Sequence, residues 1–374
     1  MTRRLIAVAV AALTVTGTAL FGTPAFADEF RDRQWHLKYL RVAEAHKIST
    51  GKGVTVAVID TGVSKHPDLD SSVLKGTDFV NPGGSGQADQ DGHGTAMAGL
   101  IAAHGKDNRG ALGLAPDAKI LPIKVLRGDR KVKLELGPAI DYAVKHGAKV
   151  INISAGGGTT ARTIEAVRGA TEADVVIVAA AGNRPGDTGV IAPALFDSVV
   201  AVAATDRQGR KSDVSVTGTA IDLAAPGEDM TSTTNRGDYA IEQTGTSDAA
   251  AIVSGAAALL RSKYPDMTAE EVVQRLEQTA TDKGAPGVDP EYGHGIVNIV
   301  AALSDKQAPA SDGPSAVPTT QPGTPAPTTT AQARPKADEK SSSSALIIGG
   351  IVAVVLLGLG GVFWLRRRRS GGTG

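Results

Sequence analysis

The sequence contains no cysteine, which excludes disulfides, thiolate nucleophiles and cysteine-based zinc sites. Stability must therefore come from packing, and any catalysis from oxygen and nitrogen groups. The formal net charge at pH 7 is +0 and no basic patch stands out, so nucleic acid is not expected as a partner. No oxygen-rich loop of the EF-hand type is present, and we expect neither a metal ion nor a cofactor.

Both ends of the chain differ in composition from a packed core. Arg3 and Arg4 precede an uncharged apolar run at 5–21, and an Ala-Phe-Ala sequence ends at Ala27. This three-part pattern predicts a cleavable signal peptide over residues 1–27. A hydrophobic start can also anchor a protein, but this run is short for a membrane span.

The C-terminal region predicts a membrane anchor. Residues 345–365 are apolar and uncharged, which is long enough to cross a bilayer as one helix. Four arginines follow at 366–369 and predict a cytoplasmic basic tail over 366–374. Residues 306–344 are rich in proline, threonine and serine and predict a disordered linker. We therefore expect a single-pass protein of the cell membrane whose globular domain is extracytoplasmic.

The segment 54–305 is long enough for one large α/β domain. Runs rich in valine, isoleucine and alanine predict strands buried on both faces of a parallel sheet, at 54–59, 120–125, 150–153, 175–180 and 199–203. Helical patterns lie at 136–146, 163–172, 249–264 and 268–279, the last opening with a capping box of Thr268 and Glu271. We expect a doubly wound, mostly parallel sheet flanked by helices, with its ligand crevice at the carboxyl ends of the strands.

Asp60 directly follows the first predicted strand and precedes Thr61 and Gly62. A carboxylate at that edge needs a partner to offset the loss of hydration. For an isolated aspartate the ordinary interpretation is an Asx turn or a helix cap.

His93 lies in the segment DGHGTAMAG, with a glycine on each side. The glycines allow close approach of the backbone, and the small residues that follow suit a buried helix. The six other histidines lack such a setting and are assigned structural roles: His36, His46, His66, His104, His146 and His294.

Ser247 lies in the segment GTSDAAAIVSG, at the start of a predicted helix. Serine at such a position is commonly only an N-cap. The helix start also offers backbone N–H groups and a positive dipole end to a developing oxyanion, so one location supplies a nucleophile and electrophilic help.

Asp60, His93 and Ser247 occur in the chain order Asp, His, Ser that is typical of subtilisin. The segments VAVIDTGV, DGHGTAMAG and GTSDAAAIVSG resemble those of the subtilase family, peptidase family S8, and the resemblance covers nearly all of residues 54–303. It implies a subtilisin-like fold and a serine endopeptidase that cleaves polypeptides through an acyl-enzyme. In such an enzyme Asp60 orients His93, which takes the proton of Ser247.

The same resemblance implies the remaining site residues. Asn183, in AAAGN, would donate its side-chain amide to the oxyanion together with the N–H of Ser247. The segment after the strand at 150–153 would align a substrate as an added strand through Ser154, Ala155, Gly156 and Gly157.

Within the family, the arrangement of signal peptide, short extension at 28–53, peptidase domain, linker and C-terminal span resembles the mycosins of type VII secretion. This implies a type VII secretion membrane complex as partner. The extension is too short for a separate globular propeptide, so we expect it to lie against the domain.

Some positions depart from the family pattern. Asp248 follows the nucleophile where an apolar residue is usual, Ala251 stands where proline is common, and Ala155 stands where leucine is frequent. Asp248 leaves open a second hypothesis, a weakly active or inactive subtilase that acts as a structural component of the secretion complex. An esterase of the α/β-hydrolase class is rejected, because that class requires a Gly-x-Ser-x-Gly motif and the order serine, acid, histidine.

Overall fold

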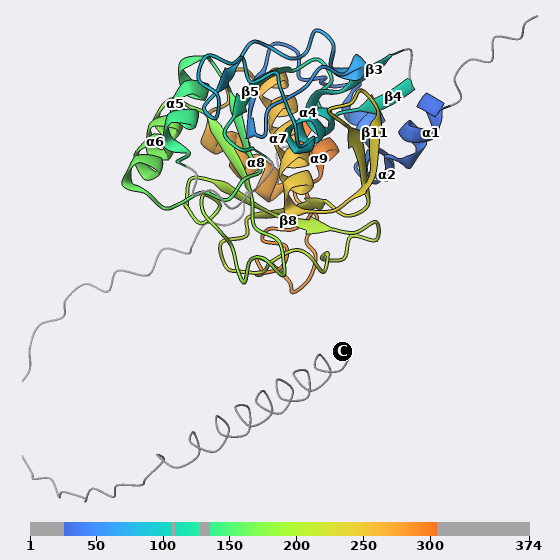
Figure 1. Ribbon diagram of the computed structural model, residues 1–374. Coiled ribbons are helices and arrows are strands. Elements are labelled where there is room, and N and C mark those ends of the chain that lie inside the picture. The colour runs from blue at the N-terminus through green and yellow to red at the C-terminus, as the bar shows by residue number, and fades with distance from the viewer. Residues whose placement is uncertain (1–25, 107–108, 128–134, 305–374) are drawn as a thin grey trace, which may run out of the picture. The chain divides into compact units, whose positions relative to one another are not determined.

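A computed structural model describes residues 26–106, 109–127 and 135–304. Its centre is a sheet flanked by helices (Figure 1). The sheet has seven strands in the order β2-β5-β1-β6-β7-β8-β9. All neighbouring strands in this sheet are parallel. The strands are β1 (Thr55–Asp60), β2 (Thr77–Asp78), β5 (Lys119–Lys124), β6 (Val150–Ile153), β7 (Val176–Ala180), β8 (Val200–Thr205) and β9 (Leu223–Pro226).

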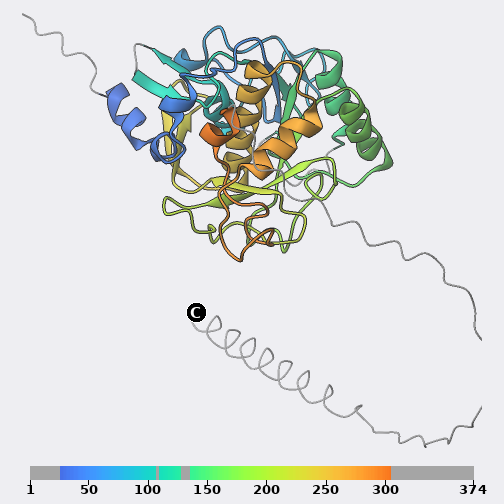
Figure 2. The same ribbon diagram turned by 180° about the vertical axis from the view of Figure 1, so that it is seen from behind.

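Helices cover both faces of the sheet. Side chains alternate along each strand, so successive residues pack against the helices of opposite faces. Val56 and Val58 of β1 belong to one core cluster with α4 (His93–Ala102) and α7 (Thr246–Lys263). Ala57 and Ile59 belong to a second cluster with α5 (Gly137–Lys145) and α6 (Ala161–Glu172). The orange helices α7, α8 (Ala269–Gln278) and α9 (Ile299–Leu303) lie together on the first face (Figure 2).

The predicted sheet is confirmed, and each of the five predicted strands is observed within two residues of its expected ends. Helix α7 begins three residues earlier than predicted, which places Ser247 inside its first turn. The capping box of Thr268 and Glu271 is present at α8. The pattern did not reveal β9 or two antiparallel pairs, β3 (His104–Lys106) with β4 (Arg109–Leu112) and β10 (Met230–Thr233) with β11 (Tyr239–Gln243).

The N-terminal extension lies against the domain and forms three short helices, α1 (Phe26–Arg33), α2 (Trp35–Tyr39) and α3 (Val42–Ala45). The side chain of Gln34 bonds both the N–H and the carbonyl of Leu112 and the carbonyl of Thr231. Ser49 donates to the carbonyl of Leu259 in α7. The extension thereby joins β4, β10 and α7, and it belongs to the folded unit.

Several predicted segments lie outside the described residues. These are the signal peptide at 1–27 except for its last two positions, the linker at 306–344, the membrane span at 345–365 and the tail at 366–374. Among the helices of the described part, none combines the length and the apolar character that a bilayer crossing requires.

Candidate active site

Asp60 and His93 form a buried hydrogen-bonded pair. Asp60 is the last residue of β1 and is fully buried, while His93 is the first residue of α4 and its side chain is 11% exposed. The Nδ1 atom of His93 lies 2.7 Å from Oδ1 and 2.9 Å from Oδ2 of Asp60, and the N–H of Thr61 donates to Oδ1 at 2.7 Å. A carboxylate can only accept hydrogen bonds, so Nδ1 of His93 must carry the proton that is donated to Asp60. The other ring nitrogen, Nε2, is then the basic one.

The turn before His93 is held by a second buried carboxylate. Asp89 accepts from the backbone N–H groups of Asp91 and Gly92 through Oδ1, at 3.0 and 2.9 Å. Its Oδ2 accepts from the N–H and the hydroxyl of Thr95 at 3.0 and 2.6 Å. Gly92 has a φ of 102°, a left-handed conformation that favours glycine. These bonds fix the start of α4 and therefore the direction of the imidazole.

Close approach of β1 and α4 requires a residue without a side chain after the histidine. A Cβ atom added to Gly94 would lie 2.1 Å from the carbonyl oxygen of Gly62 and 3.1 Å from the Cβ atom of Asp60. The glycine that follows His93 is therefore needed for the contact between Asp60 and His93, as the sequence predicted.

Lys124 connects the segments that carry Asp60 and His93, a role that no sequence motif predicted. It is the register partner of Asp60 on β5 and is only 1% exposed. Its ammonium group donates to the carbonyls of Thr61 and Ala88 at 2.7 and 2.8 Å and to the side-chain oxygen of Gln90 at 2.5 Å. One buried cation thus connects the end of β1 with the turn that carries His93.

Ser247 lies above the end of β6, the strand next to β1. Its hydroxyl lies 3.5 Å from the carbonyl oxygen of Ser154, and the hydroxyl of Ser154 donates to the carbonyl of Ser247 at 3.3 Å. Because Ile59 pairs with Ile153, Asp60 and Ser154 follow at the same edge of the sheet. The structure therefore brings Ser247 to the edge where the Asp60–His93 pair lies.

Asn183 is oriented by the first turn of α7. Its Oδ1 accepts from the N–H and the hydroxyl of Thr246 at 2.9 and 3.1 Å. The nitrogen end of the amide consequently faces Gly245, where an added Cβ would lie 3.5 Å from Nδ2. The N–H of Asn183 donates to the carboxylate of Asp187 at 2.7 Å, which fixes the backbone. An N–H donor is thus aimed at the start of α7, beside Ser247.

Ser247 and Asn183 share one pocket with the predicted substrate-aligning segment. The pocket has a volume of about 180 Å³ and its lining includes Ser154, Ala155 and Gly156. Gly157, the last residue of that segment, uses its N–H to bond the carbonyl of Ala192 at 3.1 Å. His93 lines another space, of about 360 Å³, with the β10–β11 hairpin.

Asp248 follows the nucleophile candidate in the first turn of α7 and is 4% exposed. An acidic residue in the first turn interacts favourably with the helix dipole, which explains how the position tolerates a charge.

The other histidines have structural surroundings, as the sequence predicted. His46 bonds the carbonyl of Leu114 at 2.8 Å, and His66 bonds the carbonyl of Asp238 at 3.0 Å. His36 is fully buried in α2, and burial lowers its pKa to about 3.

Two acidic residues with raised pKa values lie away from this edge. Burial raises the pKa of Asp222 to about 6 and also raises that of Glu277, in a pocket beside the starts of β7 and β8. Across the described ranges, no three acidic or histidine side chains are grouped closely enough to hold a metal ion.

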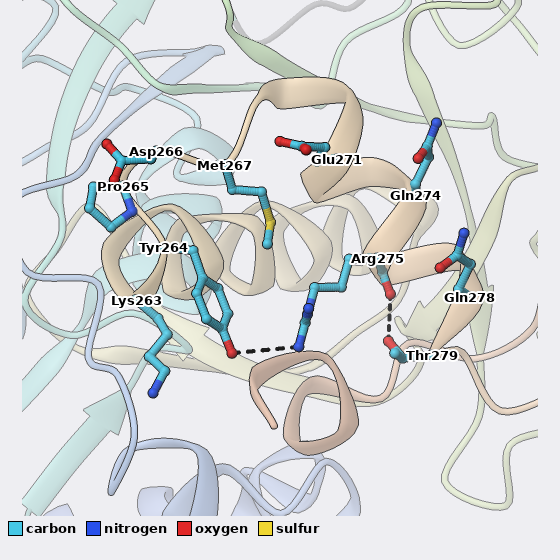
Figure 3. A pocket seen from close by; sticks show the side chains of 10 residues that line it. All are labelled: Lys263, Tyr264, Pro265, Asp266, Met267, Glu271, Gln274, Arg275, Gln278 and Thr279. Carbon is cyan, nitrogen blue, oxygen red and sulfur yellow. Dashed lines mark hydrogen bonds between the residues drawn. The ribbon is translucent and has the colours of Figure 1, made fainter. Parts of the chain in front are cut away.

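A pocket of about 640 Å³ lies between the end of α7 and α8 (Figure 3). Figure 3 shows Arg275 directed toward the hydroxyl of Tyr264, 3.5 Å away. The guanidinium also bonds the carbonyls of Ala302 and Ser304, so it holds the last described residues against the domain.

A family model described as the subtilase family, peptidase S8, matches residues 51–295. Subtilisin BL of Lederbergia lenta is 38% identical over 271 residues, which cover 72% of this chain and 97% of that protein. Mycosin-1 of Mycolicibacterium smegmatis is 34% identical over 332 residues, which cover 74% of this chain and 73% of that protein. A solved structure is similar with a TM-score of 0.67 and 35% identity, covering 74% of this chain and 89% of the other. It is described as the serine protease MycP1, an essential component of the type VII (ESX-1) secretion system.

Proposed function

The chain belongs to the subtilase family of serine endopeptidases, and we propose that Asp60, His93 and Ser247 are its catalytic triad. The observation that carries this proposal is the bond between the fully buried Asp60 and Nδ1 of His93, at the edge of the sheet where Ser247 lies in the first turn of α7. All three residues lie in segments that the sequence resemblance identified.

The reaction begins with proton transfer. Nε2 of His93 takes the proton of the Ser247 hydroxyl as the oxygen attacks a peptide carbonyl and forms a new C–O bond. Asp60 stabilises the imidazolium that results, since both of its oxygens lie within 2.9 Å of Nδ1. His93 then protonates the leaving amine as the C–N bond breaks, and a water molecule activated by the same nitrogen releases the acyl group.

The negative charge of the tetrahedral intermediate is held by N–H donors. We assign this role to Nδ2 of Asn183 and the backbone N–H of Ser247, because the opposite end of the Asn183 amide is already bonded to Thr246. A donor of this kind contributes about 3 kcal/mol to the reduction of the barrier. The fixed amide needs no reorganisation during the reaction.

The substrate is proposed to bind in extended conformation along Ser154, Ala155, Gly156 and Gly157. This segment follows β6 at the carboxyl edge of the sheet and lines the pocket next to Ser247. Backbone hydrogen bonds along an added strand are independent of side chains, so they give affinity for polypeptides in general.

A cleavage experiment tests the enzymatic proposal. The full chain and its Ser247→Ala variant are incubated separately with a mixed peptide library, and new termini are identified by mass spectrometry. We expect cleavage with the unchanged chain and none above background with the variant. Equal cleavage by both would refute the assignment of Ser247.

We further propose that the enzyme is a mycosin-like component linked to type VII secretion and anchored by the predicted span at 345–365, with its peptidase domain extracytoplasmic. The similarity to Mycosin-1 and the order of the predicted segments support this proposal. Protease protection on intact cells should leave a C-terminal tag protected and the peptidase domain accessible, and removal of residues 345–374 should release the protein. Retention of that truncated chain in the membrane would contradict the anchor.

The alternative, a structural subtilase that needs no activity, is suggested by the buried Asp248 beside the nucleophile. A deletion strain of the producing organism separates the two roles. If secretion through the type VII system is restored by Ser247→Ala, the chain serves the complex as a scaffold; if only the unchanged chain restores it, proteolysis is required.

A further inference from the structure

Two bulky aliphatic side chains, those of Leu126 and Ile191, line the pocket beside Ser247. The other walls that face Ser247 are formed largely by small residues, among them Ala155, Gly156 and Ala180. A Cβ atom added to Gly156 would lie 2.9 Å from Cδ1 of Ile191 and 4.0 Å from its Cγ1. The tip of the isoleucine side chain therefore lies directly against Gly156 of the substrate-aligning segment.

Backbone bonds fix Ile191 in this position. Its own N–H donates to the carbonyl of Ala181 at 2.9 Å, directly before the turn that carries Asn183. The carbonyl of the next residue, Ala192, accepts from the N–H of Gly157 at 3.1 Å. The segment that bears the isoleucine is thus tied to the strand end before Asn183 and to the substrate-aligning segment, which fixes the backbone position from which the Ile191 side chain enters the pocket.

In a bound substrate, the side chain on the amino side of the cleaved bond would enter this pocket. Ser247 must attack the carbonyl of that residue while Asn183 holds the carbonyl oxygen, and both groups line the same space of about 180 Å³. We propose that Ile191 forms the floor of this pocket and limits cleavage to bonds that follow a small residue, glycine, alanine or serine.

The acidic residue of the lining, Asp187, could instead favour a basic side chain. Its Oδ2, however, accepts the N–H of Asn183 at 2.7 Å and lies 3.1 Å from the position of an added Cβ at Gly182. This carboxylate serves the turn that holds Asn183. Size set by Ile191, and not charge set by Asp187, therefore selects the substrate.

The inference rests on the proposed peptidase function, and its test separates the two. Quenched peptides that differ only in the residue before the cleaved bond (Gly, Ala, Val, Leu, Phe, Lys) are assayed with the full chain and with Ile191→Gly, Ile191→Val and Val190→Ala. Val190 is the matched control, because it precedes Ile191 but packs against Gly218, where an added Cβ would lie 3.0 Å from its Cγ2. A small fluorophosphonate, which needs no side chain in the pocket, reports the reactivity of Ser247 in each variant.

One methylene too many in a pocket lowers kcat/KM by roughly 10–200-fold, and phenylalanine exceeds alanine by a phenyl group, so we expect kcat/KM of the unchanged chain to be at least about 100-fold higher for alanine than for phenylalanine. Ile191→Gly should reduce this ratio at least about 10-fold, Ile191→Val should shift it less, and Val190→Ala should leave it unchanged. A preference of the unchanged chain for phenylalanine or lysine, with normal fluorophosphonate labelling, would overturn the inference alone. Absence of both cleavage and labelling would overturn the proposed function and the inference with it.

Discussion

The buried ammonium of Lys124 offers the sharpest perturbation of the candidate site away from the reacting atoms. Replacement by methionine keeps the length and apolar stem of the side chain and removes its donors. The carbonyls of Thr61 and Ala88 and the amide oxygen of Gln90 then lose a charged partner. If the turn at 88–92 moves as a result, His93 moves with it, because that turn precedes α4.

The magnitude follows from the groups left without a donor. A buried acceptor that loses its hydrogen bond costs about 1–3 kcal/mol, so the two backbone carbonyls together account for about 2–6 kcal/mol of unfolding free energy. Methionine needs no desolvation of a charge, which offsets part of this loss and places the net change toward the lower end. A displacement of about 1 Å at the imidazole reduces kcat by about 100-fold, while KM changes less, because Lys124 bonds none of residues 154–157, which are proposed to bind the substrate.

The assay combines urea unfolding with steady-state kinetics on one peptide substrate. The matched control is Arg261→Met, because Arg261 is also buried and bonds the carbonyl of Met267 and the carboxylate of Asp174 on the other side of the domain. Both variants should lose stability, but only Lys124→Met should lose kcat per folded molecule. Equal kcat in the two variants would refute the assignment of Lys124 as a positioning residue.

Three further predictions concern the triad, the oxyanion site and the buried histidine of the extension. Asp60→Asn should lower kcat by about 10⁴-fold, because the amide no longer fixes the tautomer of His93. Steady-state measurement of kcat checks this, and a decrease of less than about 10-fold would contradict it. Asn183→Ala should lower kcat by about 10²–10³-fold with little change in KM, and a change in KM alone would contradict a role in the transition state. The folded-state pKa of His36 is about 3 against 6.5 when exposed, so its contribution to stability is complete above pH 6.5 and declines as the pH falls toward 3, by up to about 5 kcal/mol. Urea unfolding of His36→Leu between pH 7 and 4 should show a flatter pH dependence than the unchanged chain, and parallel curves would contradict this account.

Much of the sheet could be predicted from the sequence, because strands that are buried on both faces consist of continuous runs of aliphatic residues. Residues 150–153 illustrate this, since the predicted and observed bounds coincide. The short helices of the extension gave no such pattern, and isolated helices of this length are unstable in water. Their stability comes from partners such as Leu112 and Thr231, which are distant in sequence and become neighbours only in the folded chain.

Site residues that lie in a local sequence motif were predicted. Residues whose role depends on contacts with segments distant in the sequence were not. Asp60 and His93 were each identified from their motif, and the structure places them in contact. Lys124 ends an aliphatic run and carries no motif of its own, since its acceptors lie 34 to 63 residues away. Ile191 resembles any other loop residue until the fold sets it against Gly156.

The most direct measurement on the central claim is the site of covalent labelling by a fluorophosphonate. The labelled chain is digested and the adduct is located by mass spectrometry, in parallel with the His93→Ala variant. We expect a single adduct on Ser247 of the unchanged chain and strongly reduced labelling when His93 is replaced. An adduct on another residue, or labelling of Ser247 that is independent of His93, would contradict it.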